Sequence, residues 1–142
     1  MSASLKIAVA GLGTVGAGLL RLISEHSEDL SLRAGRRIEI TAISARNRKA
    51  DRGVDITPYA WHDDPISLAG DPDIDVVVEL IGGSDGIAKA LIEAAIENGK
   101  HVVTANKALV ALHGTTLARQ AEDAGVALCY EAAVAGGIPI IK

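Results

Sequence analysis

The stretch Gly11-Leu12-Gly13-Thr14-Val15-Gly16 lies directly behind a short apolar run, Leu5–Ala10, and opens a helical pattern. A strand, a G-x-G-x-x-G turn and a helix in this order are typical of dinucleotide-binding folds. Gly11 permits the tight turn, Gly13 lets the backbone approach a pyrophosphate, and Gly16 lets the helix pack close to the strand. The free amide groups and the dipole of the new helix would face the phosphates. The alternative is a turn that binds nothing, since a chain with 15 glycines can contain this spacing by chance.

The composition limits the class of protein further. The chain has 142 residues, about one domain in length, and 49% of them are hydrophobic. With no phenylalanine and one tryptophan, the core must be aliphatic, which suits a parallel sheet covered by helices. The few aromatic rings and the net charge of −4 argue against a nucleic-acid surface.

The cysteine count and the longest apolar runs bear on location. Cys129 is the only cysteine, so no internal disulfide can form, and it is expected to be a buried strand residue. No apolar run approaches the roughly 20 residues that span a bilayer, and the glycine turn interrupts the first apolar stretch. The expected setting is the cytoplasm, with no contact to membranes.

Apolar runs of strand type alternate with helical patterns along the chain. The expected strands are 5–10, 38–44, 59–61, 75–81, 101–104 and 126–130. The expected helices are 15–24, 87–98 and 109–124, with a turn and perhaps a short helix in 63–70, whereas 27–37 and 46–53 are expected to be connections. This alternation predicts an α/β, Rossmann-type doubly wound fold, with a mostly parallel six-stranded sheet and helices on both faces.

Ligands of such folds bind at the carboxyl ends of the strands, so the turns there are the candidate site. The second strand ends without the Asp or Glu that usually binds the ribose of NAD; Arg46 and Arg48 follow instead. A guanidinium matches a 2′-phosphate, so the sequence favours NADP over NAD, with Arg46 as the first contact and Arg48 as the second. The alternative is a solvated basic loop.

Three later segments are more specific than the fold. They read Val78–Gly83 (VELIGG), Gly99–Lys107 (GKHVVTANK) and Tyr130–Ile141 (YEAAVAGGIPII). In this order, behind the glycine turn, they closely resemble homoserine dehydrogenase over nearly the whole chain. The chain departs from the family at Ser84-Asp85-Gly86, where a proline is common, and at Ala135, where the family commonly has a third glycine.

The resemblance implies an NAD(P)-dependent enzyme that interconverts L-homoserine and L-aspartate 4-semialdehyde, toward threonine and methionine. It implies an NAD(P)-binding domain over 1–130, and 131–142 as the start of a connection to a substrate and dimerisation domain. A homo-oligomer is expected for the full-length protein. The 142-residue chain is then interpreted as a fragment, expected to bind NADPH weakly and to turn over no homoserine. Regulation and fusion to an aspartokinase are left open.

Lys107 is the predicted catalytic residue. It follows a strand end, where an ammonium group could stabilise negative charge on a cofactor or substrate oxygen, and it matches the lysine that the family uses in this segment. The alternative is a solvated lysine at the start of a helix, which Asn106 is expected to cap. The full set of predicted cofactor contacts is Gly11, Gly13, Thr14, Val15, Gly16, Arg46, Arg48, Gly82, Gly83, Thr104 and Lys107.

A cation site is implied by the resemblance. The family holds a monovalent cation, usually sodium, on backbone groups that match Glu131, Val134, Gly136 and Ile138. Glycines expose carbonyl oxygens, which suit a hard cation; the alternative is a plain turn. The four histidines have no zinc spacing.

Two rival functions remain at this point. One is another amino-acid-pathway dehydrogenase on the same fold, and the other is a nucleotide-sensing module without catalysis. The absence of a nucleophile–base set inside the chain is compatible with a sensor. The TANK and IPII segments favour the enzyme, because a sensor needs neither.

Overall fold

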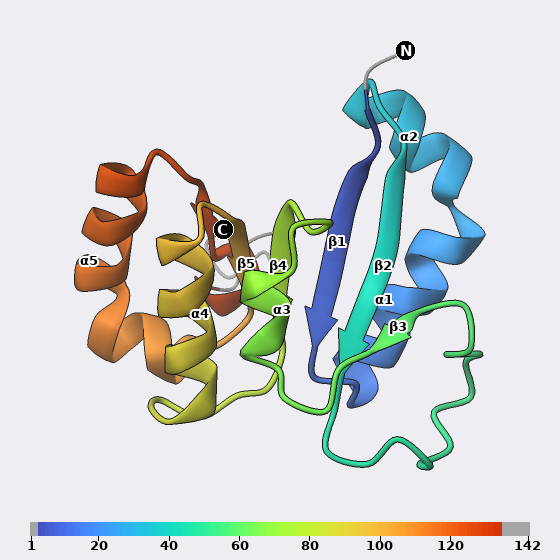
Figure 1. Cartoon of the computed structure of the whole chain (residues 1–142), viewed down its shortest axis with the longest axis horizontal. Helices are drawn as coiled ribbons and strands as arrows, with labels where there is room; N and C mark the ends of the chain where they lie inside the picture. Colours follow the sequence, from blue (N-terminus) through green and yellow to red (C-terminus); the bar gives the residue numbers. More distant parts are fainter. Residues whose placement is uncertain (1–2, 135–142) are drawn as a thin grey trace, which may run out of the picture.

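The computed structural model describes residues 3–134, which form a six-stranded sheet (Figure 1). Its strands are β1 (Leu5–Ala10), β2 (Ile38–Ser44), β3 (Ala60–Trp61), β4 (Val76–Glu79), β5 (His101–Thr104) and β6 (Leu128–Cys129). They lie in the order β3-β2-β1-β4-β5-β6, and every neighbouring pair is parallel. The predicted doubly wound α/β fold is confirmed, with the order reversing between β1 and β4.

Helices cover both faces of this sheet (Figure 1). They are α1 (Thr14–Glu25), α2 (Ser27–Ala34), α3 (Ser67–Gly70), α4 (Ile87–Glu97) and α5 (Lys107–Ala124), followed by a short 3₁₀ turn, η1 (Glu131–Val134). One apolar cluster joins α3, α4 and α5 to the sheet, and a second joins α1 to the other face. The connection from β1 to β2 therefore covers one face, and the helices that follow β3, β4 and β5 cover the other.

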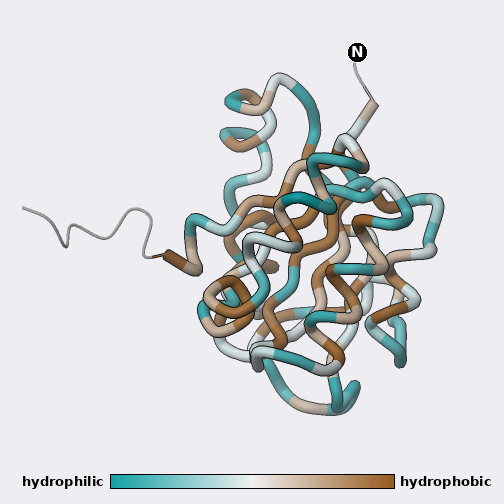
Figure 2. Tube along the Cα trace, turned by 90° about the vertical axis from the view of Figure 1, so that its left-hand side faces the viewer, coloured by the Kyte–Doolittle hydropathy of each residue, from teal (hydrophilic) through white to brown (hydrophobic). Residues whose placement is uncertain are grey.

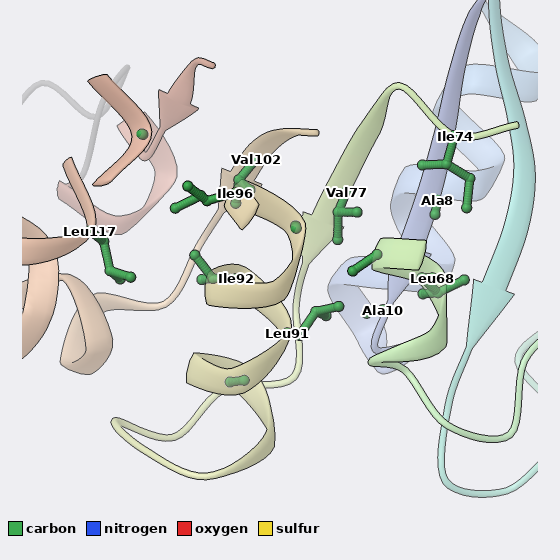
Figure 3. Packing of buried hydrophobic residues seen from close by; sticks show 14 of the residues in the cluster. Ala8, Ala10, Leu68, Ile74, Val77, Leu91, Ile92, Ile96, Val102 and Leu117 are labelled. Atoms are coloured by element: carbon green, nitrogen blue, oxygen red, sulfur yellow. The ribbon is translucent and has the colours of Figure 1, made fainter. Parts of the chain in front are cut away.

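The alternation along β1 explains the two clusters. Ala8 and Ala10 belong to the cluster under α3 and α4, whereas Ile7 and Val9 belong to the cluster under α1. The small alanines leave room on their face for the fully buried Leu68 of α3, as Figure 3 shows. In Figure 2 the apolar segments of the trace gather in the interior of the molecule, in keeping with an aliphatic core.

One expected connection is a helix. Residues 27–37 were expected to be a connection because the segment is polar, and this prediction is wrong for Ser27–Ala34, which form α2. Glu28 and Asp29 lie in its first turn and Arg33 in its last, which matches the helix dipole. Gly35 ends the helix in a left-handed conformation, with φ of 68°. The charged residues at both ends and the terminal glycine therefore indicate this helix, although none of its residues is buried.

Other boundaries differ by a few residues. α5 begins at Lys107 rather than at Leu109, because the Asn106 side chain caps it. Cys129 lies in β6 as expected, but it is only partly buried. Among residues 3–134, no helix has both the length and the apolar character needed to cross a bilayer.

Candidate functional site

The turn between β1 and α1 has two glycines that no other residue could replace. Gly11 adopts φ of 99°, and a Cβ there would lie 2.5 Å from the carbonyl oxygen of Leu80. A Cβ on Gly16 would overlap the carbonyl oxygen of Gly11. The two roles expected for these residues, a tight turn and a close helix, are therefore both present.

Gly13 differs from these two, since no neighbouring atom of residues 3–134 requires a glycine there. It is the N-cap of α1, it is exposed, and a Cβ there would meet no atom within 4 Å. No side chain caps the helix, so the first amide groups of α1 keep their hydrogen-bonding capacity for a ligand. The open space beside Gly13 and the uncapped, positive end of α1 fit an anionic group.

A cleft of about 510 Å³ opens at this turn. It lies at the carboxyl ends of the strands, the lower edge of the sheet in Figure 1. Its lining combines the glycine turn, the end of β2 with the loop after it, the chain before α3, the chain after β4 and the first residue of α4: Gly11, Leu12, Gly13, Ser44, Ala45, Arg46, Asn47, Arg52, Asp63, Pro65, Leu80, Ile81 and Ile87. The structure thus brings together three predicted contacts, Gly11, Gly13 and Arg46.

The remaining predicted contacts do not line this cleft. Thr14, Val15 and Gly16 form the first turn of α1 behind Gly13. The others lie in the loop after β2, in the turn after β4, at the end of β5 or at the start of α5: Arg48, Gly82, Gly83, Thr104 and Lys107.

A larger hollow of about 800 Å³ lies elsewhere, between α1, α2 and the beginning of β2. It includes none of the predicted site residues. Because ligands of doubly wound folds bind at the carboxyl ends of the strands, we place the site in the smaller cleft.

The basic loop after β2 is fastened to the glycine turn by Arg52. The Arg52 Nε donates to the carbonyl oxygen of Leu12 at 3.1 Å, and the guanidinium also donates to the carbonyls of Ala50 and Asn47. Arg52 and Arg48 both lie over the ring of Trp61, at 5.9 and 5.7 Å from its centroid. Arg46 is left exposed in the cleft. Sequence reasoning missed Arg52, because its partner Leu12 is 40 residues away.

Asn106 connects the ends of β4 and β5. Its Oδ1 accepts from the amide of Leu109 at 3.2 Å, which confirms the expected cap of α5. Its Nδ2 donates to the carbonyl of Gly83 at 2.6 Å. Gly82 and Gly83 both have positive φ, of 83° and 87°, so this turn depends on glycine.

Lys107 is exposed, and no described residue pairs with its ammonium group.

Thr104 points away from solvent. It is 1% exposed, and its hydroxyl donates to the buried carboxylate of Glu79 at 2.6 Å. Thr104 is one of the predicted cofactor contacts, but this geometry favours a role in closing the end of the strand. Glu79 itself was missed, although a carboxylate in an apolar run such as VVVELI signals a buried charge that needs partners.

The turn between β4 and α4 is also joined to α5 by a hydrogen bond between two side chains. His113 Nε2 lies 2.8 Å from Asp85 Oδ1, and the Ser84 hydroxyl donates to the same carboxylate. The hydrogen bond to His113, followed by that from Ser84, lowers the pKa of Asp85 below its ordinary value of 3.8. Ionised Asp85 therefore stabilises the fold above about pH 3.8, and this contribution is lost as the pH falls through the lowered pKa.

We expect His113→Ala to raise the pKa of Asp85 back toward 3.8, because the largest cause of its lowering is removed. Carboxyl ¹³C NMR titration measures this directly. Asp55 provides the internal control, since its lowered pKa depends on Thr57 and not on His113. An Asp85 titration curve identical in both proteins would contradict the hydrogen bond between His113 and Asp85.

The predicted cation residues are only partly within the described chain. Glu131 and Val134 bound η1, whereas Gly136 and Ile138 lie outside the described residues. Within 3–134, no group of three His, Cys, Asp or Glu side chains is placed to hold a metal ion.

His101, expected to be a strand residue, lies in β5 and accepts from the amide of Ala127.

The strand order and the glycine turn at the β1–α1 junction define a dinucleotide-binding domain of the Rossmann class. The family described as "Homoserine dehydrogenase, NAD binding domain" matches residues 11–131. The chain belongs to this family, as the resemblance in sequence implied.

Individual relatives agree with this assignment. The chain is 51% identical over 139 residues to a homoserine dehydrogenase of Pseudomonas aeruginosa, covering 96% of this chain and 31% of that protein. A homoserine dehydrogenase of Neisseria gonorrhoeae is 47% identical over 136 residues, covering 96% of this chain and 31% of that protein. The chain therefore spans about a third of the length of the curated relatives that it matches.

Solved structures agree as well. A homoserine dehydrogenase from Thiobacillus denitrificans superimposes with a TM-score of 0.89 at 43% identity, covering 97% of this chain and 32% of that chain. A hyperthermophilic archaeal homoserine dehydrogenase in complex with NADPH has the same fold, with a TM-score of 0.76 at 20% identity, over 97% of this chain and 47% of that chain.

Proposed function

We propose that this nicotinamide-cofactor-binding domain prefers NADP(H) and serves an enzyme that interconverts L-homoserine and L-aspartate 4-semialdehyde. The observation that carries the proposal is the cleft at the β1–α1 turn. There an uncapped helix end and the open space at Gly13 adjoin a strand end that offers Arg46 and no carboxylate. The substrates follow from the family and from the relatives, which are named homoserine dehydrogenases.

The residues divide the work of holding the cofactor. The first amide groups of α1, at Thr14, Val15 and Gly16, would bind the diphosphate, and Gly13 leaves room for it. Arg46 would bind the 2′-phosphate through a charge-assisted pair, while Arg52 holds the loop in place. When bound, the nicotinamide supplies hydride transfer. Lys107 is exposed beside the β5 end, where its charge would stabilise a substrate oxygen that becomes negative.

We expect Arg46→Ala to reduce the preference for NADPH over NADH by about tenfold or more, because a hydrogen bond to a charged group contributes roughly 1.5–3 kcal/mol. Thermal-shift titrations with both cofactors measure this, since a ligand at a hundredfold excess over Kd stabilises the native state by about 2.7 kcal/mol.

Arg36→Ala is the matched control, because Arg36 is an exposed arginine in a connection outside the cleft. It is expected to leave the ratio unchanged. An unchanged ratio in Arg46→Ala would mean that the 2′-phosphate is recognised elsewhere.

Other parts of the proposal rest on the resemblance alone. They are the monovalent cation at the positions from Glu131 to Ile138, the division at residue 130 and the homo-oligomeric state of the full-length enzyme. The proposed cytoplasmic location rests on the single cysteine. The alternative function, a nucleotide-sensing module, predicts cofactor binding without catalysis. Homoserine-dependent reduction of NADP by the full-length protein would therefore favour the enzyme over the sensor.

A further inference from the structure

Glu79 carries a carboxylate that lies fully inside the protein. It is the last residue of β4 and is 0% exposed. Its Oε1 accepts from the amides of Ile81 and Gly82 at 2.7 and 3.0 Å, and its Oε2 accepts from the hydroxyl of Thr104 at 2.6 Å. Within residues 3–134, no Lys, Arg or His forms an ion pair with it.

A buried carboxylate costs free energy, and an apolar residue would fill this position without that cost. The β4 run before it is Val76-Val77-Val78, all buried, so a further aliphatic residue would continue the pattern. Hydrogen bonds offset part of the desolvation. The presence of Glu79 is therefore better explained by its hydrogen bonds to the chain after β4 and to β5 than by packing of the core.

The contacts continue through Thr104 to Asn106. The Thr104 hydroxyl donates to Glu79 and accepts from the amide of Asn106 at 3.0 Å. Asn106 in turn donates to the carbonyl of Gly83 and caps α5. The turn formed by Gly82 and Gly83 is thus held at one amide by Glu79 and at the next carbonyl by Asn106.

This network lies on the nicotinamide half of a doubly wound site. In this fold the end of the second strand contacts the adenosine ribose, and the diphosphate crosses the β1–α1 turn. The other half of a dinucleotide must then extend toward β4 and β5, which lie on the opposite side of β1 from β2. Both ends of the network, the Gly82–Gly83 turn and the start of α5 with Lys107, lie at the carboxyl ends of these strands.

We infer that Glu79 is a positioning residue that fixes the Gly82–Gly83 turn against the start of α5 and thereby orients the nicotinamide half of the cofactor beside Lys107. This inference rests on the proposed binding of a nicotinamide dinucleotide in the cleft. The residue acts through the turn and through Asn106, not by touching the ligand.

The donor and acceptor pattern makes the inference testable with nearly isosteric variants. Thr104→Val removes the hydroxyl that joins Glu79 to Asn106 but keeps the size of the side chain. Glu79→Gln keeps the shape but places an amide donor within the network, where Glu79 presents only acceptors. Thr104→Ser retains the hydroxyl and is the conservative control.

The experiment compares two ligands on the 142-residue chain and its variants. NADPH and 2′-phospho-ADP-ribose share the adenosine and diphosphate, but only NADPH has the nicotinamide ring. Calorimetry measures the affinity for each ligand. The fluorescence emission of the reduced nicotinamide ring reports whether the ring is immobilised, and thermal melts show whether each variant is folded. We expect Thr104→Val and Glu79→Gln to weaken NADPH binding about tenfold, because the Gly82–Gly83 turn is no longer held in the binding conformation, and to lower the enhanced emission of NADPH.

The affinity for 2′-phospho-ADP-ribose is expected to stay unchanged in the folded variants, and Thr104→Ser is expected to match the original chain with both ligands. An equal loss for both ligands, or no loss for either, would overturn the inference while leaving the proposed function in place. If one variant fails to fold, the other decides. Failure of the unaltered chain to bind either ligand would instead overturn the proposed function.

Discussion

Gly13→Ala is expected to lower NADPH affinity by at least about tenfold while the protein stays folded. The added methyl group would project into the space beside the end of α1, where it meets no protein atom within 4 Å. The backbone there has φ of −75°, which alanine adopts without strain. Only a ligand that approaches the backbone would therefore meet the methyl group. Isothermal titration calorimetry with NADPH measures the loss.

The matched control for this variant is Gly18→Ala, which adds the same methyl group one turn further along α1. Gly18 is exposed, and a Cβ there also meets no atom within 4 Å. We expect unchanged NADPH affinity and a gain in unfolding free energy of about 0.5–1 kcal/mol, the cost of glycine within a helix. If Gly13→Ala bound NADPH as tightly as Gly18→Ala does, the diphosphate could not lie against Gly13.

Gly16→Ala is expected to have the largest effect on stability, lowering the free energy of unfolding by about 3 kcal/mol or more. Its methyl group would overlap the carbonyl oxygen of Gly11, which belongs to the backbone and cannot rotate away. Relief requires α1 to move away from the β1 turn, which would disturb the packing of Leu20 beneath it. Urea denaturation followed by far-ultraviolet circular dichroism gives the difference.

Three glycines of one segment thus predict three different outcomes. Gly16 is needed by the fold, Gly13 by the ligand, and Gly18 by neither. Gly11→Ala provides a second case of the first kind, since it combines φ of 99° with a contact of 2.5 Å to Leu80. A Gly16→Ala protein as stable as the Gly18→Ala protein would contradict the packing described for α1.

The sequence predicted most of the fold because its periodic signals are local. Each of the six strands was expected close to its observed place, and Gly99 and Gly125 lie where α4 and α5 end. The exception was α2, which has no buried residue and hence no apolar face for periodicity to detect. Its charged ends and the left-handed Gly35 were the available signals.

The site was less predictable, because its parts come together only through the fold. Gly11, Gly13 and Arg46 were found because each follows directly from a strand end. The hydrogen bond from Arg52 to Leu12 joins residues 40 apart, and that from Thr104 to Glu79 joins residues 25 apart. No spacing rule connects such pairs. Of these, only Glu79 carried a local signal, a charge within an aliphatic strand.

A titration of the ¹⁵N-labelled chain with NADP⁺, followed by NMR, tests whether the diphosphate of a nicotinamide dinucleotide binds to the amide groups that begin α1. Binding of the diphosphate at these amides predicts that the largest amide shifts fall on Gly13, Thr14, Val15 and Gly16, with further shifts at Arg46. It also predicts that the amides around the hollow between α2 and β2, such as Ser31, do not shift. Saturable binding that leaves residues 13–16 unshifted, or no binding at millimolar NADP⁺, would contradict it.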